Sequence, residues 1–146
     1  FLSLETEKAV QDFVLKVIHE GLVQSAHDCS DGGLAVALAE CCVSAPNARR
    51  GAVVHLPLES LRRDALLFGE SQSRVVLSVK PEQAELLLKR GQESGISAMK
   101  LGTVGGARLV IDVEKGQWSE GCRIDLAVDD VSDRWACSIE RALNQE

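Results

Sequence analysis

The sequence predicts an α/β (α+β) fold, a layered domain with a mixed β-sheet of about five to six strands and four helices. Segments with helical spacing of apolar residues alternate along the chain with segments in which apolar and polar residues alternate. Residues 34–43 are apolar on nearly all sides, which predicts a helix buried between layers. A chain of 146 residues is long enough to form one domain with a proper core, so residues 1–146 are expected to be a single domain.

The first part of the chain predicts a helix, a strand and a second helix. Residues 4–20 form an amphipathic helix that Gly21 ends. Its apolar stripe consists of Val10, Phe13, Val14, Val17 and Ile18. Residues 23–26 form a short strand, and residues 34–43 form the buried helix, whose only charge is Glu40. A helix held on most sides keeps its first turn rigid, as a binding site requires.

The middle of the chain predicts two strands. Residues 44–51 form a loop, and residues 52–58 form a strand whose apolar residues alternate. Residues 61–67 are compatible with a short helix. A polar turn over 68–72 then leads into a strand over 74–79.

The last third predicts two helices and three strands. Pro81 is suited to the first position of a helix, and Gly95 to its end. Strands over 98–104 and 108–113 are expected to pair as a hairpin through Gly105-Gly106-Ala107. The strand over 122–128 is expected to point alternate apolar residues inward, namely Cys122, Ile124, Leu126 and Val128. A final helix over 132–143 presents one apolar face, formed by Trp135, Ala136, Ile139 and Leu143.

Composition excludes several classes of protein. The net charge of −6 argues against a nucleic-acid-binding surface, which usually needs a basic face. No apolar run reaches the length of a membrane span, and the first residues do not resemble a signal peptide. Five cysteines without metal-binding spacing indicate a reducing, cytosolic setting. The chain begins with Phe1 rather than methionine, which suggests a piece of a longer polypeptide or a removed tag.

The first candidate site lies where the strand over 23–26 gives way to the buried helix. Gly32 and Gly33 carry no Cβ, so their backbone N–H groups can approach a ligand closely. The start of a helix favours phosphate, and Asp28 and Asp31 can share a divalent cation with it. The alternative is that Ser30 or Asp31 only caps the helix and the glycines only turn the chain.

The second candidate site is the run Glu70-Ser71-Gln72, followed by Arg74. A carboxylate, hydroxyl, amide and guanidinium can orient a polar ligand, and Arg74 can pair with an anion. The alternative is a hydrophilic turn. His27 and Cys29 share a strand face, but no third residue is evident to orient such a nucleophile and base, so cysteine catalysis is not expected.

Three segments, in order, resemble the phosphoribosylformylglycinamidine synthase family: SAHDCSDGGLAVALAE at residues 25–40, LFGESQSRVV at 67–76 and LGTVGG at 101–106. The resemblance is to the large subunit of the bacterial multi-subunit type. Within that subunit it is to the C-terminal domain of the second half, a member of the aminoimidazole ribonucleotide synthase C-terminal superfamily. The resemblance covers essentially the whole chain. Its first two motifs are quite specific, and the third adds modest support.

The resemblance implies an ATP-dependent C–N ligase of de novo purine biosynthesis. The full enzyme converts formylglycinamide ribonucleotide to the amidine with ATP, Mg²⁺ and glutamine-derived ammonia. This chain then lacks the N-terminal ATP-binding domains, contains no catalytic residue of its own, is inactive alone and binds neither cofactor tightly. The implied partners are those N-terminal domains, a glutaminase subunit and a small bridging subunit, all in the cytoplasm.

The resemblance also implies roles for particular residues. In the first-half copy of such enzymes, an aspartate matching Asp28 binds magnesium, and a Glu-Ser-Gln run matching Glu70-Ser71-Gln72 contacts the ribonucleotide. Carried over to this chain, Asp28 is the metal ligand. The nucleotide- or substrate-binding residues are then Gly32, Gly33, Glu70, Ser71 and Gln72. This chain resembles the second-half copy, whose related nucleotide site is structural in some members.

Two other functions stay open from the sequence. The chain can belong to a sibling ATP-using enzyme, such as selenophosphate synthetase, thiamine-monophosphate kinase or the hydrogenase maturation dehydratase. It can also serve mainly as a structural assembly module, with the apolar helix and the sheet edges making domain contacts.

Overall fold

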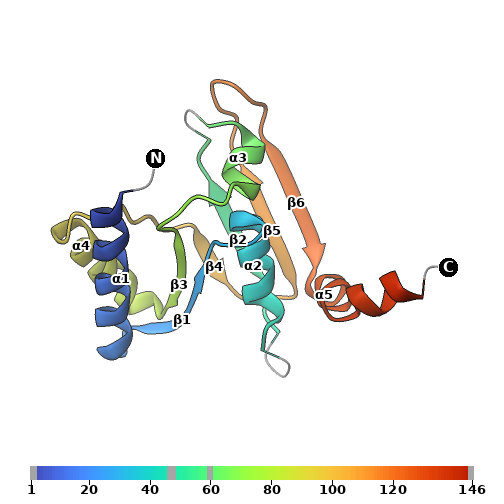
Figure 1. Ribbon diagram of the computed structural model, residues 1–146, viewed down its shortest axis with the longest axis horizontal. Coiled ribbons are helices and arrows are strands. Elements are labelled where there is room, and N and C mark those ends of the chain that lie inside the picture. Colours follow the sequence, from blue (N-terminus) through green and yellow to red (C-terminus); the bar gives the residue numbers. More distant parts are fainter. Residues whose placement is uncertain (1–2, 46–48, 59–60, 145–146) are drawn as a thin grey trace.

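The computed structural model describes residues 3–45, 49–58 and 61–144, and its helices and strands follow the predicted order (Figure 1). In chain order the elements are α1 (Leu4–His19), β1 (Val23–Asp28), α2 (Gly33–Val43), β2 (Ala52–Leu56), α3 (Arg63–Phe68), β3 (Val75–Val79), η1 (Pro81–Gln83), α4 (Ala84–Glu93), β4 (Gly102–Val104), β5 (Arg108–Val113), β6 (Cys122–Ala127) and α5 (Val128–Leu143). Pro81 starts a single 3₁₀ turn that leads into α4, as its fixed φ favours. Residues 46–48 of the predicted loop over 44–51 lie outside the described residues.

The strands of the described residues form two sheets. Four of them make a mixed sheet in the spatial order β4-β2-β5-β6, in which β2 and β5 run parallel and the other neighbours antiparallel. β1 and β3 pair antiparallel in a separate two-stranded sheet. The predicted α/β fold with a mixed sheet is confirmed, and its six strands are divided between these two sheets.

The predicted hairpin at Gly105-Gly106-Ala107 is wrong, because β2 lies between β4 and β5. Ala52 of β2 pairs with Val104 on one side and with Leu109 on the other. The connection passes around the start of β2, where the Gly51 N–H donates to the Gly106 carbonyl oxygen at 2.8 Å. Crossing two strand spacings needs about 10 Å, which the three residues between β4 and β5 span easily. A Gly-Gly turn is therefore compatible both with a hairpin between neighbouring strands and with a connection that passes around an intervening strand.

The main core lies between one face of the four-stranded sheet and α2. As predicted, α2 is buried on most sides. Its buried apolar side chains are Leu34, Ala35, Ala37, Leu38, Cys42 and Val43. They pack on the alternate residues of β2 and β5 that point the same way, including Leu56 and Ile111. Burial raises the pKa of the Cys42 thiol to about 11, which fits a cysteine that fills the core, whereas Cys41 is exposed.

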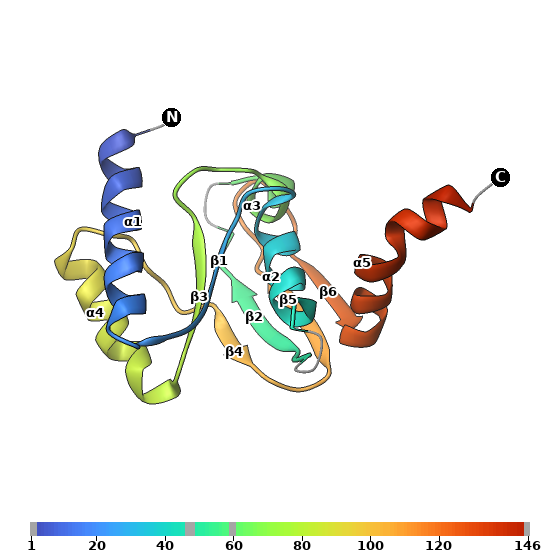
Figure 2. The same cartoon turned by 60° about the horizontal axis from the view of Figure 1, so that its bottom comes forward.

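A second, smaller core joins α1 and α4 to the two-stranded sheet. Phe13 and Val17 of α1 and Leu87 of α4 are buried there, against half-buried residues of β1 and β3. The two helices lie side by side at one end of the molecule, and α5 lies at the other end (Figures 1 and 2). The predicted stripe of the first helix is thus confirmed at its centre, while Ile18 at its end is exposed.

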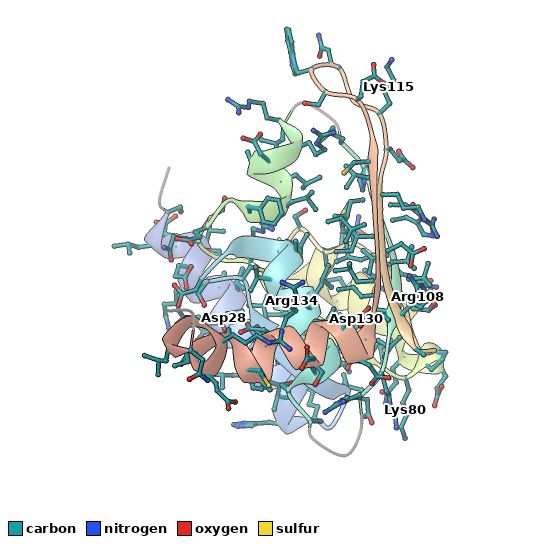
Figure 3. The ribbon with its side chains drawn as sticks, turned by 90° about the vertical axis from the view of Figure 1, so that its right-hand side faces the viewer. Asp28, Lys80, Arg108, Lys115, Asp130 and Arg134 are labelled. Carbon is teal, nitrogen blue, oxygen red and sulfur yellow. The ribbon has the colours of Figure 1, made fainter. Side chains whose placement is uncertain are left out.

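The outer face of the four-stranded sheet carries ion pairs instead of a helix. The Arg108 guanidinium contacts Asp125 at 2.5 Å, and the Arg123 guanidinium contacts Asp112 at 2.9 Å. Arg108 marks the start of β5, and Lys115 lies in the connection at the far end of β5 and β6 (Figure 3). Charged side chains make this face stable in contact with water, so helices need to cover only the other face of the sheet.

The apolar face predicted for the last helix is present on α5, but it is exposed. Trp135, Ile139 and Leu143 are 54%, 75% and 77% exposed. Only the first turns of α5 pack against the domain, through Val128 and Ser132, and the rest projects away from the sheet (Figure 2). Leu126, expected to point inward, is exposed near the same edge. Amphipathic spacing identifies a face that can be buried but does not supply the surface that buries it.

Two smaller differences concern strand and helix bounds. The strand predicted over 98–104 forms only at 102–104, because pairing with β2 extends over three residues. The short helix compatible with 61–67 is present as α3 over 63–68. Within the described ranges, no helix combines the length and the apolar character that crossing a membrane requires.

Candidate functional site

The corner between β1 and α2 is a tight turn made by two left-handed glycines. Gly32 has φ of 76° and Gly33 has φ of 73°. Gly32 is the N-cap of α2, and no side chain caps the helix. The alternative that the side chain of Ser30 or Asp31 caps the helix is therefore wrong; the Gly33 N–H donates instead to the Ser30 carbonyl oxygen at 3.3 Å.

The corner is in direct contact with the segment that precedes β3. The Gly32 N–H donates a hydrogen bond of 2.9 Å to Glu70 Oε1. A Cβ on Gly33 would lie 2.7 Å from the Phe68 carbonyl carbon and 2.9 Å from the Gly69 oxygen, so only glycine allows this approach. The two polar motifs, almost forty residues apart in the sequence, thus form one continuous surface. A carboxylate also suits this position, because the start of a helix carries partial positive charge.

Arg74 serves the architecture of this segment. Its guanidinium donates to the carbonyl oxygens of Gly69 at 3.2 Å and Leu66 at 3.3 Å, at the end of α3. Its own carbonyl oxygen accepts from the Cys29 N–H at 2.9 Å, next to the pairing of β1 with β3. The guanidinium thus has two backbone partners, and its expected pairing with an anion stays a prediction.

The polar side chains of the two motifs face solvent. The side chain of Asp28 is 71% exposed, and Glu70, Ser71 and Gln72 are also exposed. A hydrogen bond from Ser30 lowers the pKa of the Asp28 carboxyl, so this group is ionised at neutral pH. Among the described residues, no three His, Cys, Asp or Glu side chains are grouped to hold a metal ion. The expectation that Asp28 and Asp31 share a divalent cation with a bound phosphate therefore stays a prediction.

Asp28 is nevertheless suited to share a magnesium ion. Mg²⁺ typically takes one or two carboxylates, completes its octahedron with phosphate oxygens and keeps several waters. An exposed, ionised carboxylate beside a glycine turn meets the protein part of that requirement.

His27 and Cys29 do not form a nucleophile and base. Cys29 is buried, and burial raises the pKa of its thiol. The His27 Nδ1 lies 2.7 Å from the Asp28 carbonyl oxygen, and its Nε2 lies 3.3 Å from the Glu40 carboxylate of α2. The imidazole therefore links β1 to α2, in agreement with the expectation that cysteine catalysis is absent.

Sequence reasoning missed one contact of this site. The Ser73 hydroxyl donates to the carboxylate of Glu7, which lies on α1, 66 residues earlier in the chain. No local pattern marks Glu7, because it is one of several acidic residues on α1. Only the fold brings it to the end of the Glu70-Ser71-Gln72 run.

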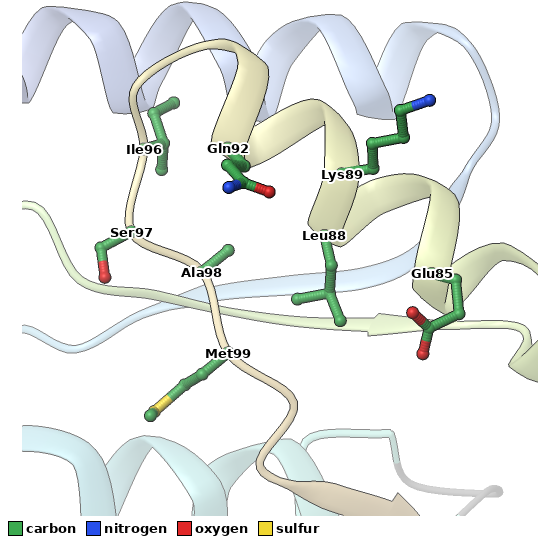
Figure 4. Close-up of a pocket in the computed structure, with 8 residues that line it drawn as sticks. All are labelled: Glu85, Leu88, Lys89, Gln92, Ile96, Ser97, Ala98 and Met99. Carbon is green, nitrogen blue, oxygen red and sulfur yellow. The ribbon is translucent and has the colours of Figure 1, made fainter.

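The site is an open surface. Two depressions of about 440 and 450 Å³ lie elsewhere on the molecule, one between α4 and residues 96–99 and one at the end of α5. Figure 4 shows the first, lined by Leu88, Met99 and neighbouring residues, none of which belongs to either motif. The exposed polar side chains of the two motifs therefore lie outside both depressions.

The comparisons with known proteins agree with the fold and its motifs. The family described as "AIR synthase related protein, C-terminal domain" matches residues 3–114. The chain belongs to this family. The match includes α1, both polar motifs and the four strands from β2 to β5, whereas β6 and α5 lie beyond it.

The curated relatives of this AIR synthase related domain include phosphoribosylformylglycinamidine synthase subunits PurL. That of Anaeromyxobacter sp. (strain Fw109-5) is 47% identical over 117 residues, which are 75% of this chain and 15% of the relative. That of Caldanaerobacter subterraneus subsp. tengcongensis is 44% identical over 135 residues, 92% of this chain and 17% of the relative. The chain thus spans about a sixth of the length of these relatives.

Solved structures of Thermotoga maritima PurL share the fold. The complex with FGAR superposes with a TM-score of 0.68 at 24% identity, covering 86% of this chain and 21% of that one. The complex with ATP gives a TM-score of 0.67 at 22% identity over the same shares. At such identities the likeness establishes the arrangement of helices and strands and leaves the roles of residues to other arguments.

Proposed function

We propose that this domain is part of an ATP-dependent amidoligase that converts formylglycinamide ribonucleotide to formylglycinamidine ribonucleotide in purine biosynthesis. The observation that carries the proposal is the 44% identity to a PurL subunit over 92% of the chain. In our proposal it is the C-terminal domain of the second half of such a subunit. Because the chain spans about a sixth of the subunit, it would be inactive alone. The cytoplasm is the compartment that this role implies.

The open surface of the two motifs supplies one wall of a cleft. Since Glu70 already accepts from the Gly32 N–H, the glycines would shape the corner and let a phosphate approach, while Glu70, Ser71 and Gln72 would contact the nucleotide or substrate. Asp28 would bind magnesium together with the phosphates of ATP, and the metal would neutralise phosphate charge. In our proposal, the upstream domains of the same polypeptide supply the opposite wall and the catalytic groups.

The proposed assembly includes a glutaminase subunit and a small bridging subunit. One solved neighbour is described as PurLQS from Thermotoga maritima, which supports a multi-subunit complex of this kind. The net charge of −6 and the open polar wall give no reason to add nucleic acid or membranes to these partners.

The proposal is tested with the longer polypeptide that carries this domain. We expect turnover of formylglycinamide ribonucleotide with ATP and ammonia, and impaired turnover or lower nucleotide occupancy in Asp28→Asn without loss of folding. If Asp28 is only a turn residue, stability would change by about 1 kcal/mol and activity would change little. Turnover of selenide or thiamine phosphate instead would favour a sibling enzyme.

A second candidate is a mainly structural assembly module, which the exposed apolar face of α5 favours. Calorimetric titration of the 146-residue chain with Mg²⁺-ATP and with the ribonucleotide tests how much of the site it holds. We expect weak or absent binding, because only one wall is present. Tight binding would contradict the view that other domains complete the site.

A further inference from the structure

Ser73 has an unusual backbone conformation directly after the Glu70-Ser71-Gln72 run. Its φ is 63°, and among the described residues it is the one non-glycine residue with positive φ. The left-handed region is disfavoured for residues with a Cβ, so it persists where surrounding contacts impose it. Such a residue beside a binding segment requires a contact that holds it.

Glu7 of α1 provides that contact. Its Oε2 accepts from the Ser73 hydroxyl, and its Oε1 accepts from the Gln11 side-chain amide at 2.7 Å. These two hydrogen bonds, the one from Ser73 first, lower the pKa of the Glu7 carboxyl, which is therefore ionised at neutral pH. A hydrogen bond to a charged acceptor is stronger than one between neutral groups.

α1 is itself a fixed support. Phe13 and Val17 bury its inner face in the second core, and the Ser3 side chain caps its first turn. Glu7 lies one turn from that cap, so its carboxylate has a defined position. The strained residue is thereby held to a packed element outside its own loop.

The other end of the binding segment is held as well. Glu70 accepts from the Gly32 N–H at 2.9 Å, at the corner of α2. Within the described residues, no hydrogen bond joins the side chains of Ser71 or Gln72 to another residue. Their directions therefore depend on the two fixed ends, one at Glu70 and one at Ser73.

We propose that Glu7 is a positioning residue for the Glu70-Ser71-Gln72 segment, acting through Ser73 without touching the ligand. This inference rests on the proposed function, which assigns ligand contacts to that segment. Removing the Glu7 carboxylate would let Ser73 relax to an ordinary backbone conformation and turn Gln72 away from its bound direction.

The test measures equilibrium binding of formylglycinamide ribonucleotide and of Mg²⁺-ATP to the longer polypeptide. Gln72→Ala identifies which probe this segment contacts. For that probe, we expect Glu7→Ala to weaken binding about tenfold, and Glu7→Gln, which keeps an acceptor, to restore part of the loss. Glu5→Ala is the matched control, because it removes another acidic residue from the same first turn.

A second comparison separates positioning from general stability. In a Ser73→Gly background the hydroxyl is absent and glycine adopts positive φ without strain. Glu7→Ala should then weaken binding no further, although any effect on α1 itself would remain.

The outcomes distinguish the two proposals. If Gln72→Ala weakens neither probe, the proposed role of the segment is wrong. If Gln72→Ala weakens one probe while Glu7→Ala leaves it unchanged, or if Glu7→Ala acts equally in both backgrounds, the positioning role of Glu7 is overturned.

Discussion

Replacing Gly33 with alanine tests the close contact that joins the two motifs. The new Cβ would lie 2.7 Å from the Phe68 carbonyl carbon and 2.9 Å from the Gly69 oxygen. These are backbone atoms, which cannot rotate away as the end of a side chain can. Overpacking of this kind costs about 1–3 kcal/mol. The left-handed φ of 73° adds about 1–2 kcal/mol for a residue with a Cβ.

Gly95→Ala is the matched control for this prediction. Gly95 has nearly the same φ, 71°, but a Cβ there would meet nothing within 4 Å. We therefore expect Gly33→Ala to lower the free energy of unfolding by about 2–5 kcal/mol and Gly95→Ala by about 1–2 kcal/mol. The difference between the two variants isolates the contact with residues 68–69.

Urea unfolding followed by far-ultraviolet circular dichroism measures both variants on the 146-residue chain. Equal m-values would show that the compared states are the same. If Gly33→Ala costs no more than Gly95→Ala, α2 does not approach the segment before β3 as closely as described. The joining of the two motifs into one surface would then lose its main support.

Two further predictions concern the sheet and the last helix. The hydrogen bond from Arg108 lowers the pKa of the Asp125 carboxyl below its ordinary 3.8. The ion pair therefore stabilises the folded chain fully above the pKa that Asp125 has in the unfolded state. This stabilisation is lost as the pH falls through the lower, folded-state pKa. At neutral pH, Arg108→Met should therefore have a lower free energy of unfolding than the unsubstituted chain, and below about pH 4 the two values should converge. Urea titrations in which the two chains differ equally at both pH values would contradict this. Leu56 is 1% exposed, so Leu56→Ala should lower the free energy of unfolding by about 2–5 kcal/mol. Leu143→Ala on α5 should change it by no more than about 0.5 kcal/mol, as measured by thermal unfolding. Similar losses in the two variants would mean that α5 is packed in solution.

Helix and strand positions followed from the sequence because local spacing determines them. The apolar residues of α1 and α2 predicted both helices to within one or two residues, and the alternation in β2, β3 and β6 predicted those strands. Partners are set by contacts between distant residues. The insertion of β2 between β4 and β5 depends on pairing over about fifty residues, which a Gly-Gly turn signal does not encode.

The two motifs of the candidate site were predictable because each concentrates glycines and polar groups in a short run. Their contact through Gly32 and Glu70 comes from the fold. The structural use of Arg74 and the contact of Glu7 with Ser73 were not predictable, since both depend on where backbone oxygens and a distant helix come to lie. The exposure of Trp135 shows the reverse limit, because a strong local pattern does not ensure burial: its indole N–H donates to the Glu40 carboxylate at 3.4 Å, while 54% of its surface stays exposed.

The central place of β2 has a consequence for how this chain emerges from the ribosome. Both neighbours of β2 are made later, β4 beginning about fifty residues after it and β5 following soon afterwards. During that interval the apolar residues of β2 have two open edges and no sheet to join. Translation takes several seconds to add fifty residues, so the nascent strand must avoid other chains until residue 113 is free. β2 would then gain both of its neighbours at a late, nearly simultaneous step in which β4 and β5 close on either side of it, and β6 would pair with β5 afterwards.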